Sequence, residues 1–79
     1  MGRLDTIKTK CWRKFLEEHE CYFYKEAKGS HQKWKKKGSP RSIIFRPADK
    51  EVPLAHLKSN LETLGISKVD FLTWVNNNC

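Results

Sequence analysis

The sequence predicts an α+β domain with a helix, three antiparallel strands, a second helix and a short closing helix. Apolar residues recur with helical spacing near both ends of the chain. Between these two stretches, aromatic and β-branched residues cluster in three short segments. Two glycine-containing turns separate the segments, so we expect an antiparallel three-stranded sheet with the helices on one face.

The first helix is expected from about Thr9 to His19. One apolar stripe marks it, formed by Cys11, Trp12, Phe15 and Leu16. We interpret Trp12 and Phe15 as core residues rather than ligand-binding residues. His19 is interpreted as a cation suited to the helix end rather than as a catalytic group. Residues 1–8 are mostly polar and are expected to fray.

The three strands are expected over 21–27, 31–36 and 41–45. Lys28-Gly29-Ser30 forms the first turn, in which Gly29 can take a positive φ that other residues resist. Lys37 to Pro40 forms the second turn.

Alternation along the second strand separates its residues onto two faces. Trp34 is the only large apolar residue here, so its face should meet the core. His31 would then share a wet, cationic face with Lys33 and Lys35. Two roles remain for His31 at this point, a simple surface residue or a catalytic base.

The second helix is expected to start at Pro53 and to cover the sheet with Leu54, Leu57, Leu61 and Leu64. Gly65 should end it, and Ser67 with Asp70 should cap a final helix through Val75, which leaves 76–79 as a tail. His56 is expected to face solvent. Lys58, Ser59 and Asn60 are interpreted as a solvated helix face rather than a surface beside the sheet.

The net charge of +7 is concentrated in the middle of the chain. Residues 25–50 hold nine Lys or Arg and two acidic residues, a net +7, and the remainder sums to zero. Such a surface attracts polyanions, and nucleic acid is the usual partner. A solubilising surface or an acidic protein partner would account for the same charge.

Composition also bounds the class of protein. Seventy-nine residues make one domain, with an expected core over about 9–75. No apolar run is long enough to cross a membrane, and no membrane partner is expected. Three widely spaced cysteines, Cys11, Cys21 and Cys79, favour reduced thiols in a cytoplasmic protein. No metal site or cofactor is expected, because clustered ligands are lacking.

The chemistry of His31 fits cleavage of RNA. Imidazole titrates near neutral pH, so it can take a proton from a ribose 2′-hydroxyl and later return one. Nearby lysines would stabilise the charge that grows on the phosphate. The proposed RNA contacts are Lys28, Gly29, Ser30, Lys33, Lys35 and Arg41.

Several stretches together resemble the HicA family of toxins from toxin–antitoxin pairs. They are Lys28-Gly29-Ser30-His31, Lys50-Glu51-Val52-Pro53-Leu54 and Leu61-Glu62-Thr63-Leu64-Gly65-Ile66-Ser67. The resemblance implies a fold similar to a double-stranded-RNA-binding domain and a metal-independent mRNA interferase. It implies that His31 is catalytic and that a HicB-type antitoxin covers the active surface.

The sequence departs from the family pattern at one position beside the turn. Many members have a second histidine directly after the first, and here that position is Gln32. The alternative to an endoribonuclease is therefore a non-catalytic RNA-binding module of the same fold.

Overall fold

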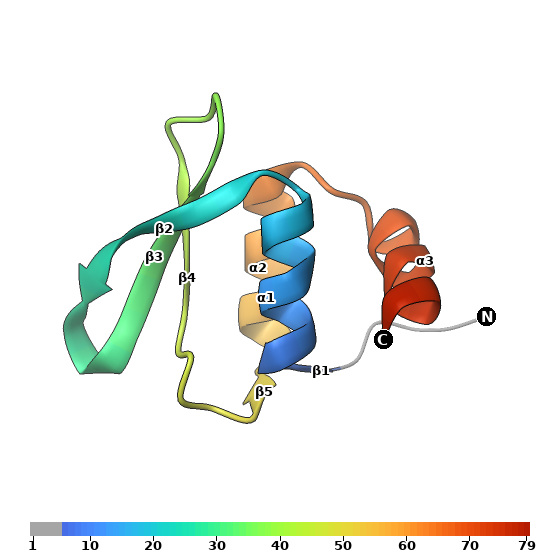
Figure 1. Cartoon of the computed structure of the whole chain (residues 1–79), viewed down its shortest axis with the longest axis horizontal. Helices are drawn as coiled ribbons and strands as arrows, with labels where there is room; N and C mark the ends of the chain where they lie inside the picture. Colours follow the sequence, from blue (N-terminus) through green and yellow to red (C-terminus); the bar gives the residue numbers. More distant parts are fainter. Residues whose placement is uncertain (1–5) are drawn as a thin grey trace.

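The computed structural model describes residues 6–79 (Figure 1). In chain order the elements are β1 (Ile7–Lys8), α1 (Thr9–Glu18), β2 (Cys21–Ala27), β3 (His31–Lys36), β4 (Ser42–Phe45), β5 (Glu51–Val52), α2 (Leu54–Leu64) and α3 (Lys68–Asn78). A single 3-10 turn, Lys28–Ser30, joins β2 to β3. The α+β class and the three central strands are confirmed.

The central sheet is antiparallel, with strand order β2-β3-β4. Trp34, in the middle of β3, pairs with Phe23 on one side and Ile43 on the other. The register shifts between Phe23 and Lys25, so β2 carries a bulge at Tyr24. Trp34 and Ile43 are both buried, as strand alternation predicts for the face that meets the core.

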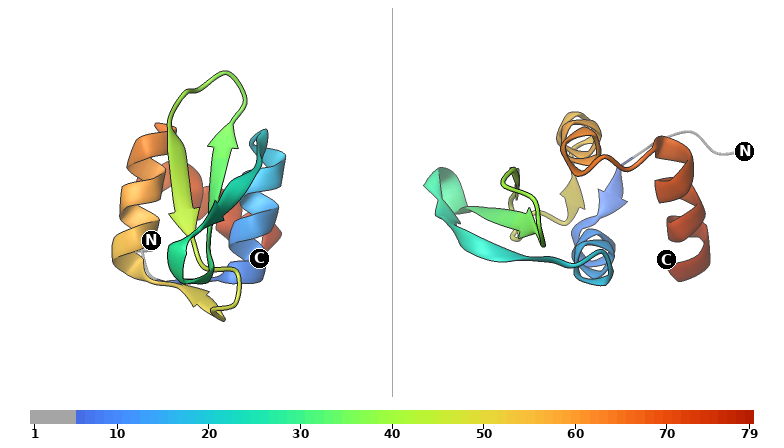
Figure 2. Two further views of the ribbon diagram at one scale, coloured as in Figure 1. Left: turned by 90° about the vertical axis from the view of Figure 1, so that its left-hand side faces the viewer. Right: turned by 90° about the horizontal axis from the view of Figure 1, so that it is seen from above.

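The elements stack in layers. Figures 1 and 2 show the sheet on one side, α1 and α2 next to it on one face, and α3 on the far side of these two helices. The expected placement of helices on one face is confirmed, and α3 adds an outer layer beyond α1. No helix among residues 6–79 is long and apolar enough to cross a membrane.

The core is aromatic and centres on α1. Trp12 is fully buried, and its ring lies 6.5 Å from that of Phe45 on β4 and 5.9 Å from that of Phe71 on α3. Phe15 is also fully buried and packs edge-on against Phe71. Since α1 contacts both the sheet and α3 through these rings, Trp12 and Phe15 are core residues, as predicted.

The ends of α2 and α3 follow their sequence signals. Gly65 has φ +73° at the end of α2, and the Ile66 N–H donates to the Leu61 carbonyl at 3.0 Å. The Ser67 hydroxyl accepts the Asp70 backbone N–H at 3.1 Å and caps α3.

Two expectations about the ends of the chain are wrong. Ile7 and Lys8 do not fray but pair antiparallel with Val52 and Glu51, and Ile7 is buried. Residues 1–5 lie outside the described part of the chain. A two-residue strand has too little alternation to be recognised in a sequence, whereas the burial of Ile7 accounts for its order.

The final helix also continues beyond Val75, to Asn78. The Asn78 side chain donates to the Trp74 carbonyl at 2.8 Å, and the Cys79 N–H donates to the Val75 carbonyl at 2.8 Å. The run of asparagines suggested a tail, because Asn has low helix propensity. These two hydrogen bonds extend the helix to Asn78 despite that preference.

The expectation of three reduced cysteines is also wrong. Cys11, on α1, forms a disulfide with Cys79, which follows α3. Their sequence separation of 68 residues gave no local signal for pairing. Cys21 remains free and buried; burial raises the pKa of its thiol, and the charge of Lys36 acts in the opposite direction.

Reduction of this disulfide should destabilise the protein. Cross-linking residues 68 positions apart removes much of the entropy of the unfolded chain, on the order of 4 kcal/mol in the chain-entropy model. We expect dithiothreitol to lower the urea concentration at which half of the natural protein is unfolded. The Cys79→Ser variant should unfold at that same lower urea concentration, with or without reductant. Identical midpoints for the natural protein under both conditions would contradict this expectation.

Candidate active site

The turn between β2 and β3 positions the histidine. Ala27 and His31 form the last pair of the hairpin, so three residues close the turn. Gly29 has φ +71° and Ser30 has φ +62°. Two consecutive residues in the left-handed region reverse the chain tightly, and Gly29 takes this conformation without the steric cost that Ser30 bears.

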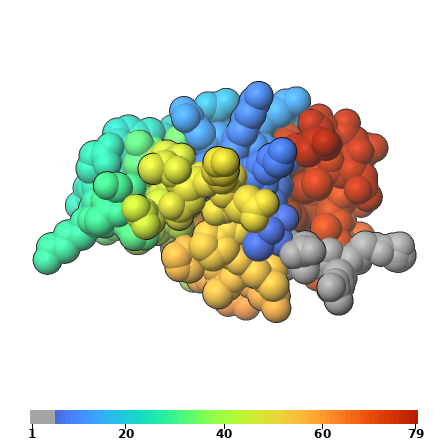
Figure 3. Space-filling view, turned by 90° about the horizontal axis from the view of Figure 1, so that it is seen from below, coloured from blue at the N-terminus to red at the C-terminus, as the bar shows by residue number. Residues whose placement is uncertain are grey.

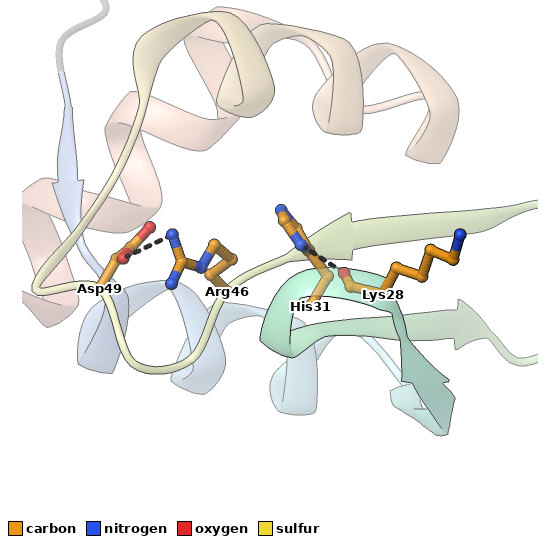
Figure 4. Close-up of polar contacts among 4 residues, drawn as sticks. All are labelled: Lys28, His31, Arg46 and Asp49. Carbon is orange, nitrogen blue, oxygen red and sulfur yellow. Dashed lines mark hydrogen bonds and ion pairs between the residues drawn. The ribbon is translucent and has the colours of Figure 1, made fainter.

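The His31 ring has a fixed orientation. Its Nδ1 lies 2.9 Å from the Lys28 backbone carbonyl, as Figure 4 shows. A carbonyl can only accept, so the hydrogen is assigned to Nδ1, and Nε2 of the neutral ring keeps its lone pair. The hairpin therefore presents Nε2 as a proton acceptor.

Gly29 also makes room for the imidazole. A Cβ at this position would lie 3.3 Å from Nδ1 of His31 and 3.6 Å from Cε1. A side chain at residue 29 would therefore press on the ring as well as strain the backbone.

Gly29→Ala should reduce both stability and RNA cleavage. The positive φ costs an alanine about 1 kcal/mol, and the new methyl group crowds the ring that carries the proposed chemistry. Gly38→Ala is the matched control, because Gly38 has φ +82° and an added Cβ would meet nothing within 4 Å. We expect similar losses in thermal stability and a fall in cleavage rate for Gly29→Ala alone. Equal cleavage rates for the two variants would contradict the positional role of Gly29.

A cavity of about 290 Å³ lies between the hairpin and α2. Its lining residues are His31, Ile44, His56, Ser59 and Asn60. Figure 4 shows the His31 ring projecting from the start of β3 toward α2. His31 is partly exposed on the face opposite the buried Trp34, as strand alternation predicts, and it also lines a cavity that α2 completes.

Asn60 fixes the helix side of this cavity. It is buried, with 7% of its surface exposed, and its side chain donates to the Ile44 carbonyl at 2.9 Å. The expectation of a solvated helix face is wrong for Asn60, whereas Lys58 and Ser59 are exposed, and Ser59 also lines the cavity. His56 is exposed, as expected, but it also lines the cavity.

Sequence reasoning missed these α2 residues as part of a site. A signal was present, because His56, Ser59 and Asn60 stand at steps of three and four residues and so share one helix face.

The predicted cationic residues are spread along the sheet. Figure 4 shows the Lys28 side chain extending away from the imidazole, so its contact with His31 is through the backbone carbonyl. Lys33 pairs with Lys25 and Ile44 and shares the face of His31 by alternation. The Lys35 ammonium lies 4.0 Å from the centre of the Tyr24 ring.

Arg41 lies at the opposite end of the sheet from His31. It precedes β4, next to Ser42, which pairs with Lys35. Strand rise places it about 16 Å along the sheet from His31. Arg41 and His31 therefore cannot contact the same phosphate, although they can contact one extended strand.

Further cations lie beside the hairpin. Arg46 follows β4 and forms an ion pair with Asp49 at 3.8 Å (Figure 4). Figure 3 shows the segment from the end of β4 through β5 (yellow) between the hairpin, α1 and α2. A groove of about 550 Å³ between this segment and α1 carries Lys10, Arg13, Lys14 and Lys50, together with Glu17 and Asp49.

Residues 6–79 include no group of three or more His, Cys, Asp or Glu side chains placed to hold a metal ion.

The Gln32 side chain makes two hydrogen bonds away from His31. Its Oε1 accepts the indole N–H of Trp34 at 3.1 Å, and its Nε2 donates to Glu26 at 3.4 Å. Because Gln32 and His31 alternate along β3, the residue that departs from the family pattern points away from the imidazole.

Comparison with known families identifies the family of this chain. The family model of the HicA toxin of bacterial toxin–antitoxin systems matches residues 12–66. No curated protein sequence and no solved structure matched the chain. The matched range contains the Gly-Ser-His turn, the three central strands and α2. The chain therefore belongs to the HicA toxin family.

Proposed function

We propose that the protein is a metal-independent endoribonuclease, an mRNA interferase toxin, in which His31 is the catalytic residue. The orientation of His31 carries the proposal: Nδ1 is held by the Lys28 carbonyl, which leaves Nε2 of the neutral ring as the proton acceptor, and His31 lines the cavity. Nε2 takes the proton of a ribose 2′-hydroxyl, and the 2′-oxygen attacks the adjacent phosphorus. The products are a 2′,3′-cyclic phosphate and a 5′-hydroxyl.

The charge distribution supports RNA as the substrate. The net charge of +7 lies between residues 25 and 50, which include the hairpin and β4. Lys28, Gly29, Ser30, Lys33, Lys35 and Arg41 are the proposed RNA contacts. With Arg41 distant from His31, we assign Arg41 to flanking nucleotides and Lys33 to the neighbourhood of the cleaved phosphate.

The membership in a toxin–antitoxin family supports a protein partner as well. We propose a HicB-type antitoxin that covers the cavity and the cationic surface of the hairpin. Residues 1–79 act as one domain, with the core over about 9–75, and the site of action is the cytoplasm, where mRNA is found.

The test is cleavage of a long single-stranded RNA by purified protein in EDTA. The substrate is then resynthesised with a single 2′-deoxynucleotide at each mapped cut. We expect cleavage of the RNA, a cyclic phosphate end, and no cut at the deoxy positions. Equal cleavage at deoxy positions would overturn the 2′-hydroxyl mechanism.

Binding without cleavage at any protein concentration would instead favour the non-catalytic RNA-binding module. In that case the affinity should fall steeply with added salt, because the lysines would hold the phosphates by counterion release.

A further inference from the structure

Cleavage by the proposed route needs a second proton transfer that His31 does not provide at the same moment. When the 2′-oxygen attacks, the bond between phosphorus and the 5′-oxygen breaks, and the leaving oxygen must gain a proton. His31 has just received a proton on Nε2, on the side of the attacking oxygen. An efficient site therefore places an acid on the opposite side of the phosphate.

We infer that His56 is this acid, so that the site works with two histidines facing each other across one cavity. The inference rests on the proposed function. His31 lines the cavity from β3 and His56 lines it from α2. The two residues belong to different elements and share a cavity of about 290 Å³, which has room for a phosphate and part of a sugar.

The other lining residues leave His56 as the candidate. Ile44 has no exchangeable side-chain proton, and the Asn60 amide is occupied with the Ile44 carbonyl. The Ser59 hydroxyl is too weak an acid to protonate a leaving group at neutral pH. Imidazolium is suited to this role, because histidine is the side chain that most often serves as a general acid in catalysis.

Hydrogen bonds to two backbone carbonyls, those of Ile44 and Lys28, hold the two histidines in place. Asn60 ties α2 to β4 at Ile44, and Ile44 pairs with Lys33, two residues beyond His31 on the same strand face. His56 stands one helical turn before Asn60, so this hydrogen bond also fixes its position. The His31 ring is fixed separately by the Lys28 carbonyl. Asn60 is therefore a positioning residue.

The position of His56 also suits an anionic group. It lies in the first turn of α2, which receives no side-chain cap at Pro53. Backbone N–H groups in a first turn have no partner within the helix, and the positive end of the helix dipole favours an anion near this turn.

The proton balance of the step is complete. His31 gains the proton of the 2′-hydroxyl, the 2′-oxygen bonds to phosphorus, the bond to the 5′-oxygen breaks, and protonated His56 gives its proton to that oxygen. After this step His31 is protonated and His56 is neutral, the reverse of their states before it. Hydrolysis of the cyclic phosphate by water reverses the two roles and restores them.

The test uses two matched substrates at a cleavage site mapped for the natural protein. Each is a deoxy strand with a single ribonucleotide; one has the natural 5′-oxygen leaving group and the other has sulfur in its place. A thiolate leaves without protonation, because thiols have pKa values of about 8.5, far below those of alcohols. Loss of an acid is therefore rescued by sulfur, whereas loss of a base is not.

We expect His56→Ala and His56→Gln to cut the oxygen substrate about 10²–10⁴-fold more slowly and the sulfur substrate near the natural rate. His31→Ala should be slow on both substrates. Glu62→Gln, an exposed change on the same helix, is the control and should cut both normally. Thermal melts should be unchanged for the His56 variants, because the side chain is exposed.

Two results would overturn the acid role of His56 and leave the proposed function intact. One is natural cleavage of the oxygen substrate by both His56 variants. The other is an equal loss on both substrates, which would indicate a structural role. If the natural protein cuts neither substrate nor any RNA, the proposed function fails, and this inference fails with it.

Discussion

His31→Ala is expected to abolish metal-independent RNA cleavage, with a rate about 10²–10⁴-fold below that of the natural protein. The lost group is Nε2, the proton acceptor of a ring that lines the cavity and whose Nδ1 is held by the Lys28 carbonyl at 2.9 Å. RNA binding should persist, because most of the basic residues are untouched. The measurement is the single-turnover cleavage rate in EDTA beside a binding titration at the same salt concentration.

His31→Asn separates chemistry from turn structure. An asparagine amide can donate to the Lys28 carbonyl as Nδ1 does, but it cannot accept a proton at neutral pH. We expect His31→Asn to melt close to the natural protein and to be as slow as His31→Ala. If all three proteins cut equally, another residue or a contaminating nuclease performs the reaction.

Trp12→Ala should cause the largest loss of stability among core substitutions. Trp12 is fully buried between the rings of Phe15, Phe45 and Phe71, at centroid distances of 5.5, 6.5 and 5.9 Å. Truncation of a buried tryptophan costs about 3–5 kcal/mol, and the whole stability of a small domain is only about 5–15 kcal/mol. We expect the urea midpoint, followed by circular dichroism, to fall sharply, with partial unfolding in buffer.

Trp12→Phe provides the comparison. The indole N–H of Trp12 is buried and has no hydrogen-bond partner among the described residues, so phenylalanine removes an unsatisfied donor and keeps an aromatic ring. The loss should be much smaller than for alanine. Equal losses for the two substitutions would show that the contacts between α1, the sheet and α3 do not depend on the ring.

Local sequence patterns predict most of the fold. The glycine and serine turn residues, the aromatic run in β2 and the leucine spacing of α2 each report a structure formed within a few residues. The positive φ of Gly29 and of Gly65 follows from the same local reasoning. Elements that depend on distant partners were not predictable this way. Ile7 is ordered by Val52, and Cys11 pairs with Cys79.

In the candidate site, too, the part formed by neighbouring residues is predictable from the sequence, and the part formed by distant residues is not. His31 was identified from its turn, because the Gly-Ser-His stretch is contiguous. The cavity around it was not, since Asn60 reaches Ile44 across 16 positions and brings His56 with it. A sequence-based expectation of an exposed face treated β3 as an isolated strand. Packing of α2 beside β4 adds a cavity next to His31, which remains partly exposed.

The two edge strands of the central sheet, β2 and β4, affect whether the protein associates with itself. An edge strand with unpaired amide and carbonyl groups can pair with a strand of another molecule, and aggregates can grow from such pairing. At β4, Asn60 takes the Ile44 carbonyl and so occupies an acceptor that another chain could use. At β2, the bulge at Tyr24 interrupts the pairing register within an aromatic run, and Lys25 adds charge beside it. The exposed aromatic segment of β2 is thereby a poor template for edge-to-edge aggregation.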